Sequence, residues 1–172
     1  MNEKYPIDQV NALSRADFAR VVGPAFEYSV WIAEATWPRR PFTGLEGLHK
    51  ALCSTVQNDG EEKQLALIRA HPDLVGRAAL AGKLTEASTS EQASAGLDKL
   101  APDEIAAFQR FNEAYRSKFG FPFVICARLN KKEAILTGFR KRLQNSRAEE
   151  IKTALEQIGQ IAYLRLKDII ES

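Results

Sequence analysis

The sequence predicts an all-α fold, a single-domain compact helical bundle of about eight to ten helices with one buried extended segment. Helix start signals recur along the chain, because a small polar residue often stands three positions before an acidic one, as in a capping box. These pairs are Ser14 and Asp17, Thr43 and Glu46, Ser88 and Glu91, Asn130 and Glu133, and Ser146 and Glu149. Strand-like alternation of apolar and polar residues is hard to find.

The length of the chain agrees with one domain over residues 1–172. The chain has 172 residues, of which 45% are apolar. That is enough for one substantial core and too little for two comfortable domains. We find no repeat period, low-complexity tract or linker that would divide it.

The individual helices follow from the start signals and from the breaks between them. Ser14 separates two short helices, and the proline-containing turn Trp37–Phe42 ends the third. Asn58–Gly60 separates the next two, and Pro72 disfavours a helical backbone at the residue before it. The polar stretch 85–94 is expected to be a loop that enters a helix. The predicted helices span residues 8–13, 15–22, 25–36, 44–58, 61–70, 74–81, 89–98, 102–118, 131–144 and 147–170.

One segment interrupts the helical pattern. Residues 121–127, Phe-Pro-Phe-Val-Ile-Cys-Ala, are aromatic and β-branched, follow a glycine and contain a proline. We expect a buried, extended connection. Its backbone amides and carbonyls need partners in the protein, in water or in a ligand, so the segment is a candidate to line a binding site.

Charge and composition argue against several classes of function. The chain has 24 Lys and Arg residues against 22 Asp and Glu, so no overall field attracts nucleic acid or an anionic membrane. The basic residues Lys131, Lys132 and Arg140–Arg142 are expected to form a solvated helix face. The longest apolar runs are far shorter than the roughly 20 residues of a membrane helix. The chain ends show neither a secretory signal nor a peroxisomal address, and we expect a cytoplasmic protein.

The cysteines and histidines do not indicate a disulfide framework or a metal site. Cys53 and Cys126 form no Cys-x-x-Cys pair, which fits a reducing compartment. His49 and His71 belong to no spacing typical of zinc or iron ligands, so no metal is expected. Cys126 has apolar neighbours, which blunt the reactivity of a thiol, and we interpret it as a small buried core residue.

His71 is the first candidate for chemistry. Pro72 places it at a helix exit, where the carbonyl end of the helix favours a protonated imidazole. An imidazole titrates near neutral pH, so this position suits a proton donor. The alternative is a histidine that only caps the last carbonyls of its helix.

Ser88, Glu91 and Gln92 form the second candidate cluster. Ser-x-x-Glu is the spacing of a capping box, which alone explains the pair. A helix start also presents amide donors and the positive end of a dipole, so the same place can bind an anion.

Arg165 is the third candidate. Ile151, Leu155, Ile158 and Ala162 precede it on the apolar stripe of the last predicted helix. A buried guanidinium needs a carboxylate partner, which either the protein or a ligand can supply. A guanidinium that reaches water along a packed stem is a further alternative.

Taken together, these motifs resemble the 2-oxo-4-hydroxy-4-carboxy-5-ureidoimidazoline (OHCU) decarboxylase family of purine breakdown. The matching words are His-Pro-Asp-Leu at 71–74 with Gly76, Leu-Thr at 84–85 with Ser-Thr-Ser-Glu-Gln at 88–92, Gly-Leu at 96–97, and Phe-Pro-Phe-Val-Ile-Cys-Ala-Arg at 121–128. The likeness runs along nearly the whole chain. The order and spacing of these motifs are more specific than any one of them.

The resemblance implies a cofactor-free lyase that forms (S)-allantoin and CO2 from the small-molecule ureidoimidazoline, and a homodimer. It implies that His71 is the catalytic proton donor and that Glu91 is important for catalysis. The substrate-binding residues that it implies are Pro72, Ser88, Thr89, Ser90, Glu91, Gln92, Phe123, Val124, Ile125, Cys126, Ala127 and Arg165. Two alternatives stay open: another small-acid lyase or hydrolase on the same scaffold, and a non-catalytic helical interaction module.

Overall fold

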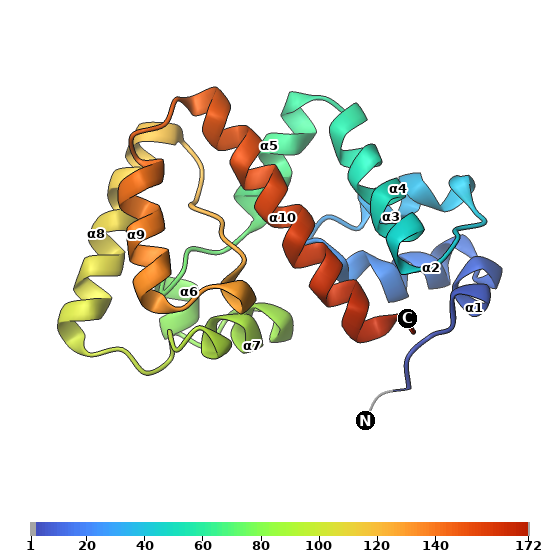
Figure 1. Ribbon diagram of the computed structural model, residues 1–172, viewed down its shortest axis with the longest axis horizontal. Helices are drawn as coiled ribbons and strands as arrows, with labels where there is room; N and C mark the ends of the chain where they lie inside the picture. The colour runs from blue at the N-terminus through green and yellow to red at the C-terminus, as the bar shows by residue number, and fades with distance from the viewer. Residues whose placement is uncertain (1–2, 172) are drawn as a thin grey trace. The chain divides into compact units, whose positions relative to one another are not determined.

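The all-α prediction is confirmed. The computed structural model describes residues 3–171, and this part of the chain contains ten α-helices, three short 3-10 helices and no strand beyond an isolated bridge between Tyr5 and Ile170 (Figure 1). The α-helices are α1 (Ile7–Ala12), α2 (Arg15–Val22), α3 (Trp31–Thr36), α4 (Leu45–Asn58), α5 (Glu61–Ala70), α6 (Arg77–Leu80), α7 (Glu86–Ser94), α8 (Pro102–Phe119), α9 (Lys132–Arg142) and α10 (Arg147–Ile169). The 3-10 helices are η1 (Gly23–Ala25), η2 (Trp37–Arg39) and η3 (Ala127–Leu129).

The chain divides into two compact units. The central unit comprises His71–Ile158, and the terminal unit comprises the residues up to Ala70 together with those from Gly159 onward. The terminal unit therefore holds α1 to α5 and the second half of α10, while α6 to α9 and the first half of α10 belong to the central unit.

The terminal unit has an aliphatic and aromatic core. Phe18 of α2 stacks on Phe42 with ring centroids 5.8 Å apart, and both side chains are buried. α3 packs against α2 and α4. The hydroxyls of Thr36 and Thr55 lie 2.6 Å apart, so the part-buried polar atoms at the α3–α4 contact are hydrogen-bonded to each other.

The central unit is built around an aromatic cluster. Tyr115 of α8 contacts Phe121 and Phe123 edge to face, and Phe123 stacks on Phe139 of α9 at 3.8 Å between ring centroids. All four side chains are fully buried. The expected buried segment is confirmed, since residues 121–127 have no helix before η3 and only Ile125 is partly exposed.

The helix predicted over residues 25–36 is wrong, because the chain forms η1 and then restarts at Trp31. Tyr28 between them has φ 44°, a left-handed conformation that no helix contains. The Ser29 hydroxyl donates to the Glu27 carbonyl at 2.8 Å. Such a local side-chain bond competes with helical hydrogen bonding, and the pattern of apolar residues did not reveal it.

The capping predictions are confirmed at two positions and wrong at three. Ser14 and Ser146 accept the backbone N–H groups of Asp17 and Glu149, as predicted. α4 instead follows Gly44, and α9 follows Lys131, neither with a side-chain cap. The third error, at Ser88, concerns α7 and is described with the site.

Candidate functional site

The loop after α5 carries His71. α5 ends at Ala70, so the helix stops where Pro72 predicts. The His71 side chain is 7% exposed, and Pro72 is partly buried. We call residues 71–76 the His71 loop. A histidine buried at a helix end is held in one place, as a group that delivers a proton to one face of a substrate must be.

Side chains from α7 and α8 hold the His71 loop. Gln92 of α7 accepts the Val75 backbone N–H at 3.1 Å, and its amide nitrogen lies 3.4 Å from the Asp73 carbonyl oxygen. Asn112 of α8 donates to the Leu74 carbonyl at 2.7 Å. Three consecutive residues of the loop are therefore bonded to neighbouring helices.

Val75 shows how firmly the loop is held. Its φ is 54°, a conformation that is a genuine outlier for a β-branched residue, and its side chain is buried. Arg116 of α8 adds an ion pair to Asp73 at 2.9 Å. Strained backbone persists where surrounding contacts determine it, and strain of this kind clusters at functional sites. The predicted helix over 74–81 is correspondingly shortened to α6.

α7 begins earlier than predicted, and Ser88 is not its cap. Thr85 is the N-cap, and its hydroxyl accepts the Ser88 backbone N–H at 3.2 Å. The helix ends at Ser94 instead of residue 98 because Gly96 takes φ 79° and Leu97 N–H bonds back to the Gln92 carbonyl, a Schellman end. Ser88 and Glu91 therefore lie inside one helix, and no capping box explains the pair.

The candidate residues of α7 differ in exposure. Ser88 and Gln92 are buried, at 4% and 7% exposure, Glu91 is partly buried, and Thr89 and Ser90 are exposed. The side-chain amide of Gln92 is hydrogen-bonded to the backbone of the His71 loop. Glu91 is thus the acidic group of α7 that lies on the more buried side of the helix.

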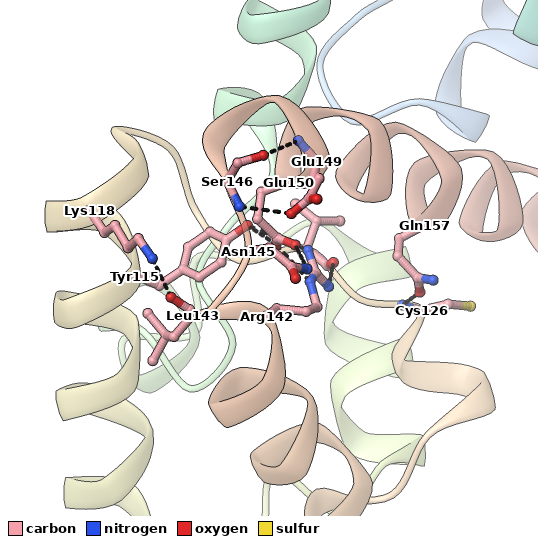
Figure 2. A network of polar contacts seen from close by, with 11 residues as sticks. Tyr115, Lys118, Cys126, Arg142, Leu143, Asn145, Ser146, Glu149, Glu150 and Gln157 are labelled. Carbon is pink, nitrogen blue, oxygen red and sulfur yellow. Dashed lines mark hydrogen bonds and ion pairs between the residues drawn. The ribbon is translucent and has the colours of Figure 1, made fainter.

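The Phe121–Ala127 segment is bonded through its backbone to α9 and α10. The Val124 carbonyl accepts a hydrogen bond from Arg142 Nη1 at 2.6 Å, and the Cys126 N–H donates to Gln157 Oε1 at 2.9 Å. Figure 2 shows Gln157 of α10 reaching Cys126. Of the three kinds of partner expected for this backbone, namely the protein, water or a ligand, the protein supplies those of Val124 and Cys126.

α7 packs against the end of the same segment. Its contact partner is η3, which begins at Ala127, and Lys131 Nζ donates to the Ser94 carbonyl at 2.8 Å. Burial raises the pKa of the Cys126 thiol, and the negative charge of Glu91 raises it further. Cys126 is 1% exposed, which confirms its interpretation as a core residue.

The central unit therefore brings together three of the elements singled out in the sequence. α7 holds the His71 loop through Gln92 and contacts the end of the Phe121–Ala127 segment through η3. The sites of His71, Glu91 and Cys126 come from three parts of the chain that are 20 residues or more apart. Their roles in binding and catalysis remain predictions.

A buried ion pair in the central unit was not predicted. Arg142 of α9 was grouped with a solvated basic face, but it is 8% exposed and pairs with the fully buried Glu150 of α10 at 2.8 Å. Asn145 and Tyr115 also donate to Glu150, and Figure 2 shows these four side chains as one network. Burial and the bond to Glu150 raise the pKa of the Tyr115 phenol.

Arg165 lies in the terminal unit. Its Nη1 forms an ion pair with Glu27 Oε2 at 2.9 Å and donates to the Pro24 carbonyl at 3.2 Å, and both charged side chains are buried. Of the alternatives weighed for Arg165, an internal salt bridge is the one observed. A contact between Arg165 and a substrate carboxylate remains a prediction.

Residues 3–171 contain no group of three or more His, Cys, Asp or Glu side chains placed to hold a metal ion. None of the described helices has the length and apolar character needed to cross a membrane.

Comparison with known proteins places this arrangement in a family context. The family model described as OHCU decarboxylase matches residues 11–167. A 2-oxo-4-hydroxy-4-carboxy-5-ureidoimidazoline decarboxylase of Halalkalicoccus jeotgali is 40% identical over 166 residues, which cover 96% of this chain and 92% of that protein. A uric acid degradation bifunctional protein of a Bacillus species is 37% identical over 163 residues, which cover 95% of this chain and 32% of that longer protein.

Solved structures share the fold. A crystal structure of (S)-allantoin synthase superposes with a TM-score of 0.78 at 26% identity, covering 97% of this chain and 55% of that one. A crystal structure of OHCU decarboxylase in the presence of (S)-allantoin gives a TM-score of 0.69 at 19% identity, covering 87% of this chain and 96% of that one.

Proposed function

The chain belongs to the OHCU decarboxylase family, and we propose that it is a carboxy-lyase converting 2-oxo-4-hydroxy-4-carboxy-5-ureidoimidazoline to (S)-allantoin and CO2 in urate degradation. The observation that carries this proposal is the position of α7, which supports the His71 loop and contacts the end of the Phe121–Ala127 segment. The family match spans both units, so we treat the chain as one OHCU decarboxylase-like domain.

Decarboxylation of this substrate needs no electron sink from a cofactor, because the substrate carries its own. The carboxylate sits on a ring carbon next to an imine, which takes up the electron pair when the carbon–carbon bond breaks and CO2 leaves. The ring hydroxyl then gives up its proton to become a carbonyl, the nitrogen of the former imine gains one proton, and the neighbouring carbon gains another from one face. The protein therefore has to orient the ring and control two proton positions, and we propose a cofactor-free reaction.

We assign these two proton positions to His71 and Glu91. Glu91 engages the ring hydroxyl as a hydrogen-bond acceptor, and His71 donates the proton that creates the stereocentre. The burial of His71 at the end of α5 and its fixed loop support a donor with one orientation. Pro72 and Ser88–Gln92 are the proposed contacts along the His71 loop and α7.

The Phe121–Ala127 segment is proposed to bind the substrate through backbone groups. Val124 and Cys126 already bond to α9 and α10. In an extended backbone, the polar groups of neighbouring residues face opposite sides. We therefore assign the substrate-facing backbone groups of the extended part of this segment to Phe123 and Ile125. Ala127 begins η3, and its carbonyl accepts the Asn130 N–H at 3.2 Å.

We further propose a cytoplasmic homodimer. Both cysteines are free thiols, which fits a reducing compartment. The dimer follows from the resemblance to the family, and its test is the molar mass in solution by light scattering.

The test of the activity compares four proteins on substrate generated in place by hydrolysis of 5-hydroxyisourate. The wild type, His71→Ala, Glu91→Ala and His49→Ala are followed by the circular dichroism of allantoin. His49 is the matched control because it is the other histidine of the chain and bonds to Gly159 in the terminal unit. The wild type and His49→Ala should form (S)-allantoin faster than the spontaneous reaction, while the other two variants should not.

The outcomes separate the alternatives. Racemic product at the spontaneous rate from all four proteins would rule out the decarboxylase. A different small-acid lyase or hydrolase would ignore this substrate, yet a thermal shift with other small acids would reveal its ligand. A non-catalytic module would show neither turnover of the ureidoimidazoline nor a thermal shift with small acids.

A further inference from the structure

We infer that Arg142 is a positioning residue for the proposed reaction: it sets where the backbone of the Phe121–Ala127 segment lies, although it touches no proposed reacting atom. This inference rests on the proposed function, because it assigns a role at the same site. It concerns a residue that the sequence placed on a solvated face.

The contacts of Arg142 with the segment are direct. Nη1 donates to the Val124 carbonyl at 2.6 Å, and the guanidinium carbon lies 4.1 Å from the centre of the Phe123 ring. Phe123 and Val124 are adjacent, so one side chain fixes both a backbone oxygen and the neighbouring aromatic side chain. A planar guanidinium can make an edge hydrogen bond and a face contact together, which an ammonium cannot.

Arg142 is itself held in place by Glu150 of α10. Its Nε bonds to Glu150 Oε1 at 2.8 Å, and Glu150 is fully buried. Asn145 donates to the other carboxylate oxygen at 2.9 Å. A charge pair that is this buried is costly to form unless its hydrogen bonds are satisfied, and here each partner has several.

The stability of the fold alone poorly explains why the Arg142–Glu150 ion pair is buried. Replacing a buried ion pair with apolar residues is often neutral or stabilising, so the pair is weak evidence for a purely structural purpose. Here the pair ends on a carbonyl of the segment proposed to bind substrate. Gln157 holds the same segment two residues later, at the Cys126 N–H.

The two anchors together restrain the backbone around Ile125. Val124 is fixed from α9 and Cys126 from α10, on either side of the residue whose backbone groups are proposed to face the substrate. A shift of about 1 Å in a positioned group can cost on the order of a hundredfold in rate. Loss of either anchor should therefore affect catalysis more than folding.

The experiment compares Arg142→Lys with Tyr115→Phe. Both changes weaken the same buried network, but only the first removes Nη1, which bonds to Val124. Tyr115 bonds to Glu150 and, at 3.5 Å, to Arg142 Nη2, and Phe keeps its ring packing. We expect Arg142→Lys to lower kcat/KM by roughly tenfold to a hundredfold and to reduce the excess of (S)-allantoin. Tyr115→Phe should lose comparable thermal stability and keep kcat/KM within about twofold.

A second pair of variants applies if Arg142→Lys does not fold. Gln157→Leu removes the acceptor for the Cys126 N–H, and Gln157→Glu keeps an oxygen acceptor at the same position. The first should lower kcat/KM and speed hydrogen exchange of the Cys126 amide, and the second should restore both.

The results separate this inference from the proposed function. An inactive wild type overturns the proposed function itself. An active wild type in which Arg142→Lys and Tyr115→Phe show the same loss of kcat/KM overturns the positioning role. Where Arg142→Lys does not fold, a Gln157→Leu variant that behaves as the wild type overturns it.

Discussion

Gln92 accepts the backbone N–H of Val75 at 3.1 Å and so ties the middle of α7 to a residue held at φ 54°. Both residues are buried. The two residues are 17 positions apart in the chain. Their hydrogen bond links the helix that carries Glu91 to the loop that carries His71. The elements that carry the two proposed catalytic residues are therefore joined by the side chain of Gln92, which was expected to contact substrate.

Gln92→Leu should reduce both stability and activity. The change leaves the buried Val75 N–H without its acceptor, which costs about 1–3 kcal/mol of unfolding free energy. Urea denaturation measures this loss, with Gln144→Leu at an exposed glutamine as the control. If Gln92→Leu is as stable as the control, the bond to Val75 contributes nothing and Gln92 serves the substrate alone.

Glu91→Gln should make the Cys126 thiol more reactive. The negative charge of Glu91 raises the pKa of Cys126, so its removal increases the thiolate fraction at a given pH. Since burial is the larger cause, we expect less than about a tenfold faster alkylation. The measurement uses a Cys53→Ser background, and a Cys126→Ser background reports Cys53 as the control. Equal alkylation rates of Cys126 in the wild type and in Glu91→Gln would contradict an electrostatic interaction between Glu91 and this thiol.

Glu27→Leu should destabilise the protein strongly. It leaves the buried guanidinium of Arg165 without its carboxylate, and breaking a buried pair in this way costs about 3–5 kcal/mol. Glu27→Leu combined with Arg165→Met should recover most of that loss. Arg20→Ala, which removes an exposed ion pair with Asp17, should change the melting temperature little. A Glu27→Leu protein as stable as Arg20→Ala would show that the pair is not structural.

Tyr115 should make the protein less stable at alkaline pH. Burial and the bond to Glu150 raise its pKa in the folded state, whereas the unfolded chain ionises near the ordinary value of about 10. The stabilisation is thus complete below about pH 10 and is lost as the pH rises further, because only the unfolded state releases the proton. Unfolding free energies measured up to about pH 11 should fall less steeply for Tyr115→Phe than for the wild type. The same slope in both would contradict this account.

Local signals predicted much of the fold. Ser14 and Ser146 cap helices as expected, and α5 ends before His71 because of Pro72. A cap is a hydrogen bond between residues three positions apart, so the nearby sequence is sufficient to specify it. Where a neighbouring residue offers a better start, as Thr85 does for α7, the same rule selects the wrong residue.

The sequence by itself determined the all-α class, the buried Phe121–Ala127 segment and the motifs shared with the OHCU decarboxylase family. Only the tertiary structure decided that Arg142 is buried against Glu150, that Gln92 holds Val75, and that Arg165 pairs with Glu27. A side chain's periodicity shows which face of its helix it occupies. Whether that face meets water, a carboxylate or a strained loop depends on packing between segments far apart in the chain, and that packing sets the cost of burying each charge.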